Sequence, residues 1–193
     1  DHFGGALGLL GGNIDQLANV DIVAPAGFMH EATSENVMAG TAMSRRSMYM
    51  YGKRLPRSAR GHIDSGLGKE PAFGTFSVLT PTITVAETGE TLNLDGIDFE
   101  FQIVSGSEAP AEFTFYLPQM NAYCGAELVS KTMHNLYTLR GAKVRDALSW
   151  SSAIDQALAQ QQEATVYFGS HHWPIWGQEN IADFLEKQRD TYK

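Results

Sequence analysis

The feature that most constrains the fold of this chain is a run of short strand-like segments in its middle. Residues 97–104 alternate apolar and polar side chains, a pattern typical of a half-buried strand. Residues 82–85 and 91–94 precede this segment, residues 112–117 follow it, and Asp95-Gly96 marks a turn. The middle of the chain therefore predicts a sheet.

Helical patterns lie on either side of this sheet. We expect a helix over residues 32–51, two helices broken near Gly141 over residues 126–162, and a terminal helix over residues 178–192. Further buried strands are predicted at residues 20–25 and 165–168. Strands in pairs with helices between them indicate an α/β layered sandwich. Residues 52–77 have no clear period and are interpreted either as a binding loop or as a surface excursion.

Size and charge exclude several classes of protein. The chain has 193 residues and a formal net charge of −8, without the basic face of a nucleic-acid-binding protein. No apolar run approaches the roughly 20 residues of a membrane span, so no stable membrane insertion is expected. A single cysteine, Cys124, excludes an internal disulfide and is interpreted as a small buried hydrophobic residue.

The first residues of the chain point to a metal site. Asp1-His2-Phe3-Gly4-Gly5 matches the part of an His-x-His-x-Asp-His motif that comes after its first two histidines. Adjacent Asp and His residues can bind one metal only where the backbone turns sharply, and the two glycines allow such a turn. We therefore expect the chain to be a fragment that lacks those two upstream histidines.

Further possible ligands follow predicted strands. His171 and His172 come directly after residues 165–168, and residues at the end of a strand in an α/β sheet face the ligand crevice. His172 is the favoured ligand and His171 has a supporting role, although either could be a core histidine. Glu108 and Glu127 also follow strand-like segments among small residues. Carboxylates together with imidazoles suit zinc or another borderline divalent ion.

Several segments together resemble one enzyme family. The sequence is similar, in order and over nearly its whole length, to the alkylsulfatases (type III sulfatases) of the metallo-β-lactamase superfamily. The segments that carry the resemblance are residues 1–5, 105–110, 121–128, 134–141 and 169–177. The resemblance implies a metallo-β-lactamase-type αββα sandwich, incomplete at its N-terminus, with residues 1–193 forming one catalytic domain.

The same resemblance implies a binuclear zinc site. Asp1, His2 and His172 would hold one zinc, and Glu127 would hold the other together with the two missing histidines. Glu108 would lie between the two metals, next to a bridging water that becomes hydroxide near neutral pH. The implied reaction is hydrolysis of an alkyl sulfate ester to an alcohol and inorganic sulfate. For the fragment alone, we expect weak or single-metal occupancy.

Residues near 135–140 would contact the sulfate group. By resemblance, Asn135 and Arg140 bind the sulfate, and His134 is a weaker possibility for substrate binding and proton transfer. Arginine offers a fixed fork of donors to an oxyanion, although Arg140 could instead satisfy the carbonyls at a helix C-terminus. An Asn at position 135 is associated in the family with primary, dodecyl-sulfate-like substrates.

The resemblance also implies a homodimer formed through a domain outside this chain, and a periplasmic or secreted location. Two alternatives remain open from the residues alone. One is another metallo-β-lactamase-superfamily hydrolase, acting on a lactam, thioester or phosphoester. The other is a non-catalytic domain with a degenerate metal site.

Overall fold

The computed structural model describes residues 2–62 and 74–193, with His2 described in its backbone only. The chain forms two compact units. Unit 1 comprises residues 1–20, 29–80 and 137–144, and unit 2 comprises residues 21–28, 81–136 and 145–193.

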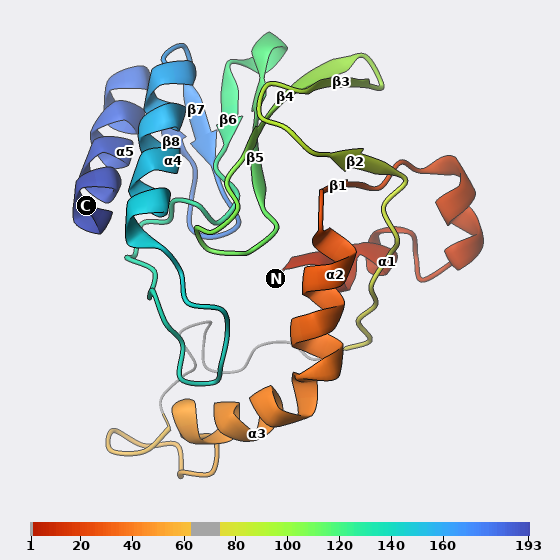
Figure 1. Ribbon diagram of the computed structural model, residues 1–193, viewed down its shortest axis with the longest axis vertical. Helices are drawn as coiled ribbons and strands as arrows, with labels where there is room; N and C mark the ends of the chain where they lie inside the picture. The colour runs from red at the N-terminus through yellow and green to blue at the C-terminus, as the bar shows by residue number, and fades with distance from the viewer. Residues whose placement is uncertain (1, 63–73) are drawn as a thin grey trace. The chain divides into compact units, whose positions relative to one another are not determined.

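Figure 1 shows the helices and strands, with β2 to β5 following one another directly along the chain. The strands are β1 (Val23–Pro25), β2 (Ile83–Val85), β3 (Thr91–Leu94), β4 (Ile97–Ile103), β5 (Phe113–Leu117), β6 (Ala122–Cys124), β7 (Val166–Phe168) and β8 (Ile175–Trp176). The α-helices are α1 (Ala6–Leu9), α2 (Phe28–Thr33), α3 (Gly40–Met50), α4 (Ala147–Gln160) and α5 (Gln178–Tyr192). Shorter helical turns are η1 (His2–Gly5), η2 (Ile14–Asn19), the π-helical η3 (Ser34–Met38) and η4 (Pro118–Met120).

Unit 2 contains both sheets. The larger sheet has the order β3-β4-β5-β6-β7-β8, and all its neighbours are antiparallel except β6 and β7. Asp95 and Gly96 both have positive φ between β3 and β4, as a two-residue type I′ hairpin turn requires. The smaller sheet pairs β1 with β2 in parallel. The strands predicted in the middle of the chain are thus confirmed, whereas β6 and β8 were not predicted.

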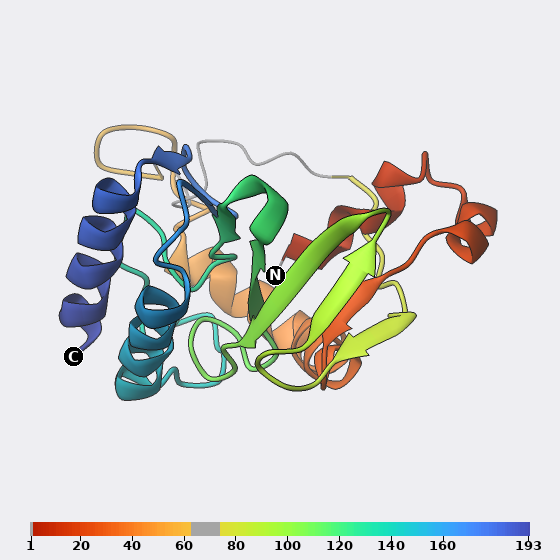
Figure 2. The ribbon, with the colours of Figure 1, turned by 90° about the horizontal axis from the view of Figure 1, so that it is seen from above.

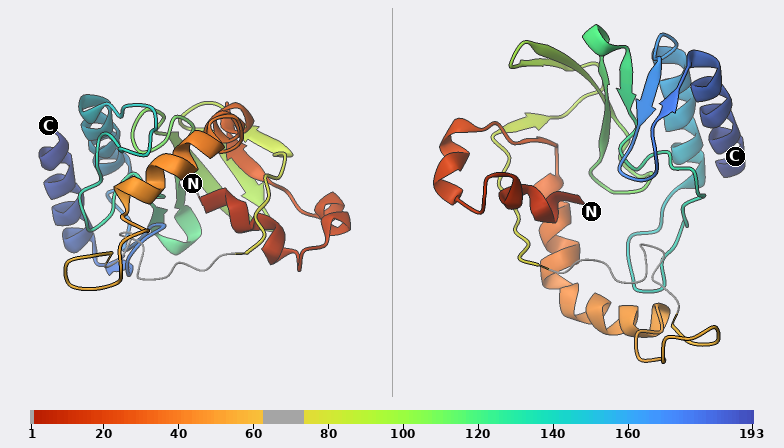
Figure 3. Two further views of the ribbon diagram at one scale, coloured as in Figure 1. Left: turned by 90° about the horizontal axis from the view of Figure 1, so that it is seen from below. Right: turned by 180° about the vertical axis from the view of Figure 1, so that it is seen from behind.

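Two helices pack near β7 and β8, at one side of the larger sheet. Figures 2 and 3 show α4 and α5 lying side by side there. In α4, Trp150, Ile154 and Ala157 follow each other at helical spacing and are fully buried. They join a core to which α5 contributes Ile181 and Leu185. The terminal helix predicted over residues 178–192 is therefore confirmed.

One helical prediction is wrong. Residues 126–146 contain no helix, and only α4 forms within the span that was predicted to hold two helices. The backbone of this segment bonds to other parts of the fold instead, as where the N–H of His134 donates to the hydroxyl of Tyr192 at 2.9 Å and that of Asp146 donates to the carbonyl of Gly106 at 3.2 Å. Asn135 and Arg140 consequently lie on irregular chain, and Arg140 does not end a helix.

Unit 1 is mainly helical. The helix predicted over residues 32–51 is present in part, because α2 ends at Thr33 and is followed by η3 and then α3. The described part of the irregular segment, residues 52–62 and 74–77, forms no helix or strand. The rest of that segment lies outside the described residues. Among the described residues, none of the helices is both long and apolar enough to span a membrane.

Candidate metal centre

Glu108 lies on a tight loop that joins β4 to β5. The N–H of Val104 donates to the carbonyl of Glu112 at 3.0 Å, and the N–H of Gly106 donates to the carbonyl of Ala109 at 3.1 Å. These bonds close the loop and turn the Glu108 side chain inward, where the residue is only 5% exposed. A buried carboxylate of this kind requires a positive partner.

Glu127 follows β6 and is placed by the neighbouring strand β7. Because β6 and β7 are parallel, their carboxyl ends lie at the same edge of the sheet. Their extensions stay paired, with the N–H of Gly125 donating to Phe168 and that of Ser170 donating to Ala126, both at 2.8 Å. This pairing brings Glu127 beside His171, whose Nε2 lies 3.2 Å from Oε1 of Glu127.

His134 is anchored through its backbone and its ring. Its N–H donates to the hydroxyl of Tyr192 at 2.9 Å, and its ring lies over Trp150 with centroids 5.5 Å apart. Its Nδ1 is 2.9 Å from the carbonyl oxygen of Asn135. A carbonyl oxygen only accepts, so Nδ1 carries the hydrogen in this contact.

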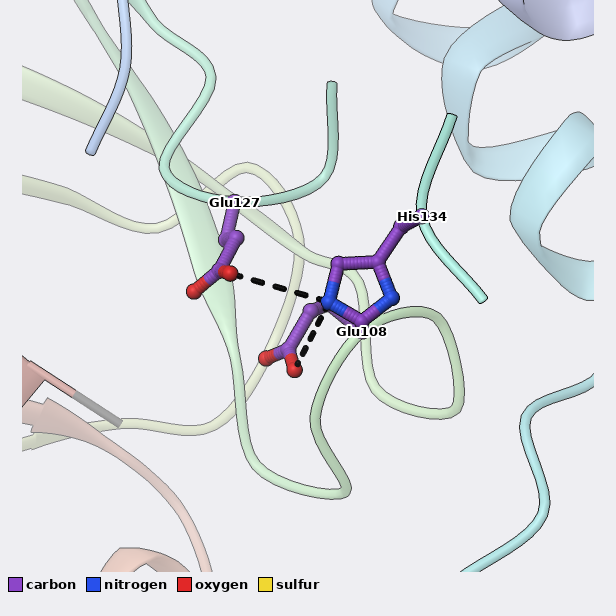
Figure 4. Close-up of side chains that lie close together, drawn as sticks. All are labelled: Glu108, Glu127 and His134. Carbon is purple, nitrogen blue, oxygen red and sulfur yellow. Dashed lines mark ion pairs between the residues drawn. The ribbon is translucent and has the colours of Figure 1, made fainter. Parts of the chain in front are cut away.

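The three side chains converge on one point, as Figure 4 shows. His134 Nε2 lies 3.6 Å from Oε1 of Glu108 and 3.7 Å from Oε1 of Glu127. One ligand atom from each residue lies within 4.8 Å of the others. With Nδ1 protonated, a neutral His134 presents a lone pair to two carboxylates. A metal cation at this point would be within reach of all three side chains, and the donor set suits a divalent metal.

A second buried carboxyl group, that of Glu112, holds the loops that carry Glu108 and Glu127. Glu112 accepts the N–H of Glu127 at 3.0 Å and, with its other oxygen, the hydroxyl of Ser107 at 3.2 Å and the N–H of Ala109 at 3.3 Å. Burial, and next the nearby charge of Glu108, raise the pKa of Glu112 to about 7, although the two amide bonds act in the opposite direction. Glu112 thereby ties the Glu108 loop to the Glu127 loop.

Arg145 supplies the positive charge beside Glu108. Its Nη2 lies 2.7 Å from Oε1 of Glu108, and the two side chains are 6% and 3% exposed. Neither Arg145 nor Glu112 was singled out from the sequence. A lone Arg before the Asp146 helix cap and a Glu at the start of a strand are too common to indicate a site.

The remaining predicted ligands are placed less directly. His172 has a positive φ of 68°, and its Nε2 lies 3.4 Å from the hydroxyl of Thr132. Among the described residues, the cluster of possible ligands contains His134 and not His172. Asp1 and the side chain of His2 lie outside the described residues. The metal-binding roles of Asp1, His2 and His172 therefore stay predictions.

The two predicted sulfate contacts lie in different units. Asn135 belongs to unit 2 and Arg140 to unit 1. Within unit 1, Arg140 lines a cavity of about 690 Å³ and donates to Oε1 of Glu35 at 3.1 Å. Apolar side chains, including those of Val37, Met43 and Val78, line the same cavity. The guanidinium of Arg140 thus lies at the wall of a mostly apolar cavity, where it is paired with Glu35.

Comparison with known proteins shows which sequences this chain resembles. It is 45% identical over its whole length to a linear primary-alkylsulfatase from a Pseudomonas species and to the alkyl/aryl-sulfatase BDS1 of Saccharomyces cerevisiae. It is 42% identical to an (R)-specific secondary-alkylsulfatase from Pseudomonas. The chain spans 29–30% of the length of these relatives. No family model matches the chain.

Solved structures give the same result. The inverting sec-alkylsulfatase Pisa1 from a Pseudomonas species matches all of this chain and 31% of its own with a TM-score of 0.90 at 40% identity. A metallo-beta-lactamase family protein from Thermus thermophilus matches with a TM-score of 0.60 at 16% identity, which reports on fold alone. The chain is therefore homologous along its whole length to alkylsulfatases, and its fold is that of the metallo-β-lactamases.

Proposed function

We propose that the protein containing this chain is a zinc-dependent alkylsulfatase, which hydrolyses alkyl sulfate esters to an alcohol and inorganic sulfate. The observation that carries the proposal is the 45% identity to alkylsulfatases over the full length of the chain. The convergence of Glu108, Glu127 and His134 supports it, because such a donor set suits a divalent metal.

The metal site has a defined task in this proposal. Glu108 and Glu127 hold two zinc ions together with Asp1, His2, His172 and residues outside this chain. Bound zinc supplies Lewis acidity and makes water a nucleophile near neutral pH. The protein holds the carboxylates ready for the metal, because Glu112 fixes the loop of Glu127 and Arg145 fixes Glu108.

Asn135 and Arg140 bind the sulfate group. The amide of Asn135 offers neutral donors, and the guanidinium of Arg140 offers a charged, planar fork. The apolar wall of the cavity beside Arg140 accepts the alkyl chain. His134 contacts the substrate or carries a proton, and its Nε2 faces both carboxylates, at 3.6 Å from Glu108 and 3.7 Å from Glu127.

The first test is release of inorganic sulfate from dodecyl sulfate by the full-length protein. Release should disappear after a chelator removes metal and should return with zinc. Glu108→Gln should abolish the zinc-restored activity, whereas Glu186→Gln, an exposed carboxylate on α5, should leave it unchanged. Absence of sulfate release from folded protein that holds two zinc ions would discard the proposal and direct attention to lactam, thioester and phosphoester substrates.

Substrate preference needs a separate comparison, because the relatives include both primary and secondary alkylsulfatases. We propose a preference for primary substrates on the basis of Asn135. Dodecan-1-yl and dodecan-2-yl sulfate, compared by kcat/KM, test this preference. Preference for the secondary ester would overturn it without affecting the reaction class. The proposed homodimer is tested by sedimentation of the same protein.

A further inference from the structure

Arg145 is a buried guanidinium with three side-chain bonds. Nη2 donates to Oε1 of Glu108 at 2.7 Å, Nε donates to the carbonyl of Glu108 at 2.7 Å, and Nη1 donates to Oδ1 of Asn135 at 3.1 Å. The residue is 8% exposed. One side chain thus touches both a possible metal ligand and a possible sulfate contact.

The backbone around Arg145 is tied to the same two segments. Its N–H donates to the carbonyl of Leu136, next to Asn135, at 2.9 Å. The N–H of the following residue, Asp146, donates to the carbonyl of Gly106 in the Glu108 loop at 3.2 Å. Asp146 also caps α4, so the backbone at this point is held by a helix that the core fixes. The backbone of Arg145 is therefore held in place, and this limits the positions that its guanidinium can take.

The contact with Arg145 decides how the Asn135 amide is turned. A guanidinium has five N–H donors and no acceptor, so it can meet only the Oδ1 side of the amide. The NH₂ group of Asn135 consequently faces away from Arg145, and the residue is exposed. This orientation leaves two donors available to an anion.

We propose that Arg145 is the positioning residue that couples the metal ligand Glu108 to the sulfate contact Asn135. Arg145 holds Glu108 through the carboxylate oxygen Oε1 and through the backbone carbonyl of Glu108. It also turns Asn135 so that the NH₂ group of the amide donates to the sulfate. This inference rests on the proposed function for the role of Asn135, whereas its metal part rests on the geometry of Glu108 alone.

The metal part is tested with Arg145→Lys in the full-length protein. Lysine keeps the charge and loses the planar fork, so its single nitrogen cannot take the places of Nε, Nη1 and Nη2, which each meet a different acceptor. We expect the zinc dissociation constant, measured by competition with a chromogenic chelator, to rise about 10–100-fold. This is the usual effect of losing a residue that holds a metal ligand without touching the metal. Arg189→Lys is the matched control, because Arg189 pairs with Asp155 and Asp190 on the helices.

The sulfate part is tested with a double-mutant cycle. Arg145→Lys should raise KM for dodecyl sulfate at saturating zinc, and it should do so much less in an Asn135→Ala background. A role that is only structural would give additive effects on KM, because the two substitutions would then act independently. Additive KM effects together with an unchanged zinc dissociation constant would overturn the proposal.

Asn135→Asp tests the amide orientation without disturbing Arg145. The aspartate keeps an oxygen for the guanidinium and replaces the NH₂ donors with an anionic oxygen that repels sulfate, so KM should rise about tenfold or more while zinc binding is not weakened. A KM equal to that of the unchanged protein would contradict the orientation. This variant also keeps the proposal testable if Arg145→Lys does not fold.

The outcomes separate the two proposals. If the unchanged protein releases no sulfate, the proposed function fails, and the zinc measurement still decides whether Arg145 holds Glu108. If the protein hydrolyses dodecyl sulfate and Arg145→Lys matches Arg189→Lys in zinc affinity and KM, the proposed function stands and the role of Arg145 is refuted.

Discussion

At the scale of single residues, the site depends on carboxylates that are buried together. Glu108 and Glu112 are 5% and 8% exposed, and removal from water makes an uncompensated charge costly. Arg145 compensates the charge of Glu108, and burial raises the pKa of Glu112 to about 7.

Burial likewise raises the pKa of the Cys124 thiol to about 11, so this half-buried cysteine is a poor nucleophile.

Glu108→Gln should weaken zinc binding by more than the roughly 10–100-fold that is lost when a residue supporting a metal ligand is replaced. The change removes a ligand charge and leaves Arg145 facing a neutral amide in a buried position. The zinc dissociation constant of the variant, set against that of Glu186→Gln, checks this. Equal constants for the two variants would remove Glu108 from the metal site.

Asp146 should make folding stability dependent on pH in the acid range. The Ser149 amide and hydroxyl, together with the Leu148 amide, hold the pKa of Asp146 below its usual value. A lowered pKa means that the stabilisation is present above the unfolded value of about 3.9 and is lost as the pH falls through the folded value. Asp146→Asn keeps an acceptor for the cap and should flatten this part of the stability profile. Urea unfolding between pH 2 and 6 measures the difference.

Residue types were predictable at this scale, and their partners were not. Glu108 and Glu127 stood out because they follow strand-like segments, and the structure places them within one cluster. The contact of His171, rather than His172, with Glu127 depends on backbone angles, including the left-handed φ of His172. Such angles are set by the surrounding chain and leave no signal in residue spacing.

At the scale of elements, local pattern was a good guide where it was strong. The alternation of residues 97–103 and the Asp95-Gly96 turn correspond to β4 and its connection to β3. The segment before α4 was mistaken for helix because it lacks proline and contains good helix formers. Tertiary partners override that propensity, as where Tyr192 accepts the N–H of His134.

Ile154→Ala in α4 should lower the free energy of unfolding by about 2–5 kcal/mol, the usual cost of emptying a packed site. Ile154 is fully buried in the core between the helices and the sheet. Leu148→Ala on the same helix is the control, because Leu148 is 65% exposed and should change stability little. Chemical denaturation of both variants tests the difference. Similar losses would show that α4 is not held by this core.

At the scale of the whole molecule, metal binding and folding should be linked. Glu108 lies between β4 and β5, and Glu127 and His134 lie between β6 and α4, so the three side chains meet only in the folded state. A ligand that binds only the folded state adds about 4 kcal/mol of stability at a thousand times its dissociation constant.

Removing metal should therefore lower the melting temperature of the full-length protein, and zinc should restore it. Calorimetry with and without a chelator measures the shift. Glu108→Gln should reduce the shift, whereas Glu186→Gln should not. If the chelator removes the metal and the melting temperature does not change, metal binding does not stabilise the folded state and the prediction is wrong.

The sequence by itself determined the elements whose signal is local, namely the central strands and the terminal helix, and it identified the carboxylates and imidazoles suited to a metal. These features depend on periodicity, turn residues and side-chain chemistry, all of which can be read along the chain. Only the tertiary structure decided that residues 126–146 are irregular, that His134 faces Glu108 and Glu127, and that Arg145 and Glu112 hold the loops. Several of these contacts join residues 10 or more positions apart, such as Asn135 and Arg145. The free energy that selects them comes from burial and hydrogen bonding in three dimensions, which residue spacing does not encode.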